Sequence, residues 1–167
     1  LCKKTFGISS QTYASICYEY GDHYETIGDF VNAEKWFKNA IEIQDKANQS
    51  LEYAKTLNAL ANIYADQGQI GPAENYYKIA LDIREQKLGK SHPDYARILN
   101  NLAGVYQFTG EYDKAISLFN EVKKIFGSIN GIDSIEYAFC LHNLANVYFE
   151  IGNYNQAELY YTNALSI

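Results

Sequence analysis

Asparagine is the residue type in this 167-residue chain whose spacing suggests chemistry. Asn58 and Asn62 stand one helical turn apart, and Asn143 and Asn146 nearly so. Asparagine costs a helix about 0.5 kcal/mol relative to alanine because its amide competes with the backbone, so some other interaction should offset it. A carboxamide carries a donor and an acceptor like a peptide bond, and a row of them can hold the main chain of an extended peptide. Alternatively, these amides bond a neighbouring helix and stabilise its packing.

Other reactive residue types do not form a recognisable catalytic or metal-binding set. The chain has three histidines and three cysteines: His23, His92, His142, Cys2, Cys17 and Cys140. The histidines lack HxxxH or HExxH spacing, and His92 is interpreted as a helix-start residue. The cysteines lack CxxC spacing, which argues against a disulfide framework or a structural zinc site. No phosphate-binding glycine motif occurs. We therefore expect a protein that is not an enzyme and uses no metal or cofactor.

Composition excludes several classes of partner. The chain has 14 Lys and Arg against 20 Asp and Glu, a net charge of −6, and no cationic cluster that a nucleic acid would require. No apolar run reaches the roughly 18 residues of a membrane helix. An aromatic content of 15% with only 2 prolines predicts an ordered chain. Three cysteines without a pairing pattern favour a reducing compartment, so we expect a cytoplasmic protein that binds neither nucleic acid nor membrane.

The elements that position the asparagines follow from an internal repeat. Four tyrosines recur at spacings of 40, 42 and 42, and a glycine follows each of them after four residues. The pairs are Tyr24 and Gly28, Tyr64 and Gly68, Tyr106 and Gly110, and Tyr148 and Gly152. Apolar residues at helical spacing on both sides of each glycine predict two helices per repeat. The glycine would end the first helix, and Asp29 or Asn153 would cap the next.

The repeat register divides the chain. Residues 1–8 resemble the tail of a preceding repeat, residues 9–48, 49–90 and 91–132 form three repeats, and residues 133–167 form a truncated fourth. The first repeat departs from the pattern at Gly21, where the others carry alanine. We expect the chain to be a fragment of a longer repeat protein.

One repeat carries the order Leu57, Ala61, Tyr64, Gly68, Ala73, Tyr77 and Ala80. With this pattern, the chain resembles the tetratricopeptide repeat family over essentially its whole length. The 42-residue period and the stretch 88–94 resemble the longer repeats of kinesin light chains. The resemblance implies an all-α fold, a right-handed α-solenoid (superhelix) of antiparallel helix pairs. It also implies that the first helices of successive repeats line a concave groove.

The same resemblance implies which side chains face a partner. The expected partner-binding residues are Lys55, Asn58, Asn62, Arg97, Asn101, Asn143, Asn146, Tyr18 and Phe139. The amides would hold a peptide backbone, the two cations would pair with acidic groups, and the two rings would pack apolar side chains. Some family members clamp a carboxylate with cations, but Asn58, Phe139 and Asn143 stand at those places. With Lys55 and Arg97 as the groove's cations, a ligand of mixed polarity is expected rather than a strongly acidic one.

These observations predict a non-catalytic scaffold that binds a peptide segment or partner protein in the concave groove. Two alternatives remain open. The chain could be a self-assembly or spacer module, which light scattering would reveal. It could instead be a regulatory sensor arm of a larger multidomain protein, which flanking sequence would reveal.

Overall fold

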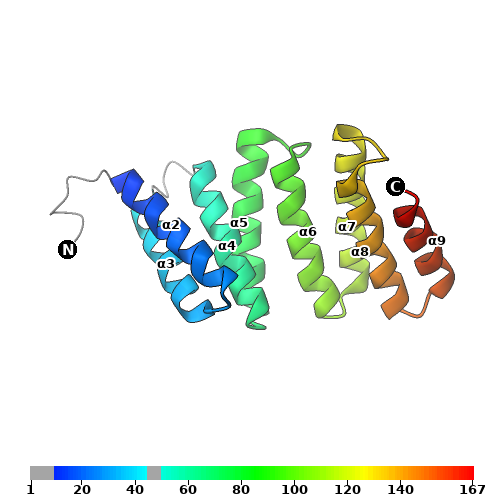
Figure 1. Ribbon diagram of the computed structural model, residues 1–167, viewed down its shortest axis with the longest axis horizontal. Coiled ribbons are helices and arrows are strands. Elements are labelled where there is room, and N and C mark those ends of the chain that lie inside the picture. Colours follow the sequence, from blue (N-terminus) through cyan, green and yellow to red (C-terminus); the bar gives the residue numbers. More distant parts are fainter. Residues whose placement is uncertain (1–9, 45–49) are drawn as a thin grey trace. The chain divides into compact units, whose positions relative to one another are not determined.

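The computed structural model describes residues 10–44 and 50–167, and the regular structure of these residues is entirely α-helical (Figure 1). The helices are α2 (Ser10–Thr26), α3 (Phe30–Ile43), α4 (Leu51–Asp66), α5 (Ile70–Leu88), α6 (Pro93–Phe108), α7 (Tyr112–Ile129), α8 (Ile135–Glu150) and α9 (Tyr154–Leu165). The predicted all-α class is confirmed. The expected tail of a preceding repeat, residues 1–8, lies outside the described residues.

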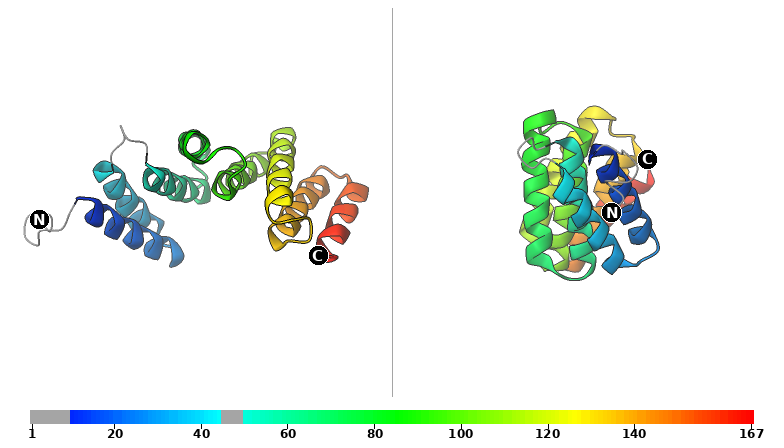
Figure 2. Two further views of the ribbon diagram at one scale, coloured as in Figure 1. Left: turned by 90° about the horizontal axis from the view of Figure 1, so that it is seen from above. Right: turned by 90° about the vertical axis from the view of Figure 1, so that its left-hand side faces the viewer.

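The helices form antiparallel pairs joined by short turns, as predicted (Figures 1 and 2). The chain divides into two compact units, Leu1–Lys87 and Leu88–Ile167. The first unit contains the pair α2 and α3 and nearly all of the pair α4 and α5. The second contains the pair α6 and α7 and the pair α8 and α9. Within the second unit α7 also packs against α8, so each pair contributes to the core of its neighbour.

The spacing of four residues between tyrosine and glycine has a backbone explanation. Gly28, Gly68, Gly110 and Gly152 have φ values of 76°, 72°, 76° and 78°, the left-handed region that glycine adopts without steric cost. The residue after each glycine then donates its N–H to the tyrosine carbonyl, for example Gln69 to Tyr64 at 2.7 Å. These bonds satisfy a carbonyl at the end of each first helix, as expected for a glycine C-cap.

Side-chain caps begin most of the helices. Asp29 and Asn153 accept hydrogen bonds from the backbone N–H groups of Asn32 and Gln156, which confirms their predicted capping role. The Nδ1 atom of His92 accepts from the N–H of Asp94 at 3.1 Å, so this histidine is the helix-start residue that the sequence indicated.

Replacing the cap residue Ser50 is expected to destabilise α4. The hydroxyl of Ser50 accepts a hydrogen bond from the N–H of Tyr53 at 3.1 Å. Ser50→Ala should lower the free energy of unfolding by about 1 kcal/mol, whereas Ser50→Asp should retain the cap. Urea denaturation measures both, with Ser117→Ala, an exposed site within α7, as the control. Equal stability of the two Ser50 variants would contradict the capping role.

The core of each helix pair combines small and aromatic residues. Ala33, Ala73, Ala115 and Ala157 are buried at the second helices. Phe37 and Phe119 are also buried there. Gly21 of α2 approaches the Phe37 ring so closely that a Cβ atom built on it would lie 2.5 Å from the ring. The glycine of the first repeat is therefore matched to its aromatic neighbour.

Candidate functional site

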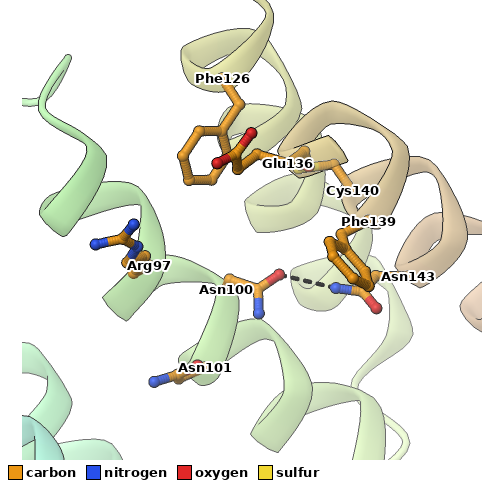
Figure 3. A pocket seen from close by; sticks show the side chains of 8 residues that line it. All are labelled: Arg97, Asn100, Asn101, Phe126, Glu136, Phe139, Cys140 and Asn143. Carbon is orange, nitrogen blue, oxygen red and sulfur yellow. Dashed lines mark hydrogen bonds between the residues drawn. The ribbon is translucent and has the colours of Figure 1, made fainter. Parts of the chain in front are cut away.

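A pocket of about 390 Å³ opens between α6 and α8 in the second unit (Figure 3). It is lined by Arg97, Asn100, Asn101, Phe126, Glu136, Phe139, Cys140 and Asn143. Phe126 comes from α7, and all the others come from the two first helices, α6 and α8. Four residues expected at the partner-binding site, Arg97, Asn101, Phe139 and Asn143, thus meet in one pocket.

Helical spacing explains why these side chains gather. On α6, Arg97 lies three and four residues before the asparagine pair, so all three share one side of the helix. On α8, Glu136, Phe139 and Asn143 follow one another at intervals of three and four residues. The opposite side of each helix carries the buried apolar residues that fix its orientation, such as Leu102.

An amide pair links the two sides of the pocket. The Nδ2 atom of Asn143 donates a hydrogen bond to Oδ1 of Asn100 at 2.8 Å (Figure 3). A second bond joins the same helices, from Nε2 of Gln107 to Oε1 of Glu150 at 2.6 Å. One of the expected groove amides, Asn143, therefore also contributes to the packing between repeats. This is the structural use that the sequence left as an alternative.

Two residues of opposite charge line the pocket, Arg97 on α6 and Glu136 on α8. The Nη1 atom of Arg97 lies 3.3 Å from Oδ1 of Asp94, one turn earlier on α6, and the guanidinium remains largely exposed. Hydrogen bonds with its own backbone and with Asn130 lower the pKa of Glu136, and the positive charge of Arg97 adds to the shift. Glu136 is therefore an ionised carboxylate at neutral pH.

The base of the pocket is apolar. Phe126 and Cys140 are 5% and 2% exposed, whereas the Phe139 ring is 63% exposed. Burial raises the pKa of Cys140 to about 11, so its thiol is neutral at pH 7. Its Sγ donates a hydrogen bond to the carbonyl of Glu136 at 3.1 Å. Cys140 thus acts as a small apolar residue rather than as a nucleophile.

The first unit brings together two other expected site residues. The Nζ atom of Lys55 on α4 lies 3.8 Å from the centre of the Tyr18 ring on α2, a cation–π contact. Burial, together with nearby carboxylates led by Asp22, raises the pKa of Tyr18 to about 12. Asn58 is half-buried on α4, one turn from both Lys55 and Asn62.

Two expected groove amides bond tyrosines of the second helices. Oδ1 of Asn62 accepts from the hydroxyl of Tyr77 at 2.7 Å, and Oδ1 of Asn146 accepts from the hydroxyl of Tyr161 at 2.6 Å. Both pairs are 15 residues apart, at equivalent places in their repeats. Asn62 also hydrogen-bonds the carboxylate of Glu25, which connects α4 to α2. The amide oxygens of these asparagines therefore hold the two helices of a pair together.

The expected partner-binding residues did not include four that line the pocket: Asn100, Phe126, Glu136 and Cys140. The signal for Asn100 and Glu136 was available, because both lie on the same helical sides as predicted site residues. Phe126 and Cys140 gave no such signal, since a buried residue on one helix becomes part of a pocket only through the packing of α7 against α8.

A second pocket, of about 430 Å³, lies between α8 and α9. It is lined by Ile135, Ala138, Phe139, His142, Tyr161, Ala164, Leu165 and Ile167. One repeat earlier, the places of Ala138 and Ala164 are taken by Ala96 and Val122, both of which are fully buried. The apolar character of this pocket therefore reflects the packing surface that all the repeats share.

Residues 10–44 and 50–167 carry no recognisable metal site or membrane-spanning helix. No group of His, Cys, Asp and Glu among them could hold a metal ion. The helices of this part of the chain are too short or too polar to cross a bilayer. Cys17 and Cys140 are free and buried, and Cys2 lies outside the described residues.

Comparison with solved structures shows the same fold. The chain resembles BtubC (BKLC) from P. vanneervenii with a TM-score of 0.82 and 23% identity, covering 99% of this chain and 66% of that one. It resembles a putative kinesin light chain from Podosopora anserina, with nearly identical TPR-like repeats, with a TM-score of 0.83 and 19% identity, covering 99% and 79%. A third similar structure is aspartyl phosphate phosphatase F from Bacillus subtilis, with a TM-score of 0.82 and 16% identity, covering 95% and 41%.

Comparison with protein families covers nearly the whole sequence. No curated protein matches the chain. The family model described as tetratricopeptide repeat matches residues 12–86, 73–127 and 94–167. Together these ranges span residues 12–167, from the first turn of α2 through α9. The chain therefore belongs to the tetratricopeptide repeat family.

Proposed function

We propose that this protein is a non-catalytic adaptor that captures a peptide segment of a partner protein at the pocket between α6 and α8. Tetratricopeptide repeats generally serve as scaffolds for protein–protein interactions, which supports the general role. The observation that carries the finer proposal is the gathering of Arg97, Asn101, Phe139 and Asn143 around one opening.

The lining suits a peptide better than a small metabolite. A pocket of about 390 Å³ with an apolar base can take one or two side chains, and polar groups at its edge can orient the chain that carries them. Phe139 is a large ring that stays mostly exposed, and an aromatic residue of this kind is a typical anchor in protein interfaces. Asn101 is half-buried at the edge, where its amide can meet a peptide bond.

Phe139→Ala is expected to weaken peptide binding about tenfold, the loss typical of an aromatic interface residue. The probes are peptides selected from a phage-displayed random library on the immobilised wild-type chain, then synthesised with a fluorescent label. Fluorescence polarisation measures their affinities, and thermal denaturation checks that the variant folds.

Phe149→Ala provides a matched control on the same helix. The Phe149 ring is 57% exposed but does not line the pocket, so its removal should change affinity less than twofold. Failure to select any peptide, or equal losses in the two variants, would overturn the proposed function.

A further inference from the structure

Resting on that function, we propose that the pocket between α6 and α8 selects a peptide in which an apolar residue lies between one acidic and one basic residue. The acidic residue would face Arg97 on α6, and the basic residue would face Glu136 on α8. The apolar residue would enter the pocket between them.

Opposite charges on the two flanking helices support this selectivity. Figure 3 shows the Arg97 side chain projecting from α6 and the Glu136 side chain projecting from α8. A peptide with two acidic residues would place one of them against Glu136. A peptide with two basic residues would place one of them against Arg97. Like charges at close range are unfavourable, so both peptides should bind less well than the mixed one.

The ion pair between Arg97 and Asp94 leaves the cation available. Its distance of 3.3 Å joins two residues on the surface of α6, and the Arg97 side chain is two-thirds exposed. Exposed pairs of this kind contribute little because water screens them. The guanidinium also has more donors than one carboxylate uses, so it can bind a second acidic group.

Apolar groups at the centre exclude a charged residue from the middle position. Phe126 and Cys140 form the buried base, and the exposed Phe139 ring stands beside it. A charged side chain placed there would lose its hydration without gaining a partner. The amide pair of Asn100 and Asn143 spans the pocket, where peptide bonds on either side of the apolar residue can meet it.

The geometry of an extended peptide sets the spacing of the charges. Side chains at positions i−2, i and i+2 of an extended chain point to the same face. The acidic and basic residues should therefore stand two positions before and two positions after the apolar residue. Neighbouring positions point away from the pocket and should tolerate any residue.

The test uses arrays of heptapeptides with Leu, Ile or Phe at the centre. Charged residues are fixed two positions before and two positions after this central residue. The four arrays carry Glu and Lys, Lys and Glu, two Glu, or two Lys, with the remaining positions randomised. Labelled wild-type chain should bind at least one of the mixed arrays about threefold or more above both like-charged arrays. Equal binding to mixed and like-charged arrays would overturn the selectivity.

Charge reversal on each helix makes the test sharper. Arg97→Glu should shift the preference to the array with two Lys, and Glu136→Arg should shift it to the array with two Glu. Glu158→Arg is the control, because it reverses an exposed charge on α9 outside the pocket and should leave the wild-type order unchanged. Thermal denaturation checks the fold of each variant.

The outcomes separate this selectivity from the function on which it rests. An unchanged order of arrays in both reversal variants, together with binding that still needs Phe139, would overturn the charge selectivity alone. Absence of binding to every array and of any phage-selected peptide would overturn the proposed function as well.

Discussion

Asn62→Ala is expected to lower the free energy of unfolding by about 2 kcal/mol. The hydroxyl of Tyr77, a residue only 2% exposed, would lose its acceptor at 2.7 Å, and a buried hydroxyl without a partner costs about 1–3 kcal/mol. The variant also loses the link to Glu25 across α2 and α4. The higher helix propensity of alanine returns about 0.5 kcal/mol. Urea denaturation followed by circular dichroism measures the change.

A double-mutant cycle with Tyr77→Phe isolates the hydrogen bond. In a chain that already carries Tyr77→Phe, the Asn62→Ala change leaves no buried hydroxyl unpaired and should cost clearly less than in the wild type. Additive effects would show that the tyrosine does not depend on the amide. A large loss of peptide affinity with unchanged stability would show that Asn62 serves a ligand instead, the use that its sequence position first suggested.

Gly21→Ala is expected to destabilise the protein by about 2 kcal/mol, although alanine is the better helix former by about 1 kcal/mol. The new Cβ would lie 2.5 Å from the Phe37 ring, which is fully buried and contacts Tyr18. Such overpacking typically costs about 1–3 kcal/mol or more, because the ring cannot move without disturbing its neighbours. The melting temperature and the urea midpoint should both fall.

Gly104→Ala is the matched control for this prediction. Gly104 also lies within a first helix, but nothing stands within 4 Å of the Cβ that alanine would add. Without a clash, the better helix propensity of alanine should raise stability by up to about 1 kcal/mol. Stabilisation by both substitutions would refute the close packing of Gly21 against Phe37.

The fold could be predicted from sequence because each element rests on local signals. The recurring tyrosine and glycine mark where a first helix ends, and the left-handed φ of Gly68 and the bond from Gln69 to Tyr64 show the mechanism. Caps such as Asp29 and His92 depend on residues two or three positions away. Interactions over such short separations can be read from the order of residues alone.

The site could be predicted only in part, because it depends on contacts between distant residues. The family resemblance assigned Arg97, Asn101, Phe139 and Asn143 to the concave side of their helices, and the four residues line one pocket. The sequence did not reveal that Asn143 bonds Asn100, 43 residues away. An amide suits a peptide or a neighbouring side chain equally well, so only the packed structure identifies its partner.

An alignment of the four repeats with one another could have revealed that these asparagines have tyrosine partners. In the second and fourth repeats, a further tyrosine stands thirteen places after the tyrosine near the end of the first helix, and an asparagine stands two places before it. Tyr77 and Asn62, on either side of Tyr64, are an example. The first and third carry phenylalanine there, and Asp22 or Gly104 takes the place of the asparagine. The amide thus accompanies the hydroxyl that needs an acceptor.

That pairing limits how new proteins can be assembled from this chain by recombination. A chimera that receives α5 in place of α7 would set a phenol hydroxyl where α6 offers Gly104, which has no side-chain acceptor. A crossover in the turn between paired helices would separate a donor from its acceptor, whereas a crossover before the first helix would transfer both. Gene fusions that keep both helices of a pair together should therefore give more stable proteins than fusions joined at Gly68 or Gly152.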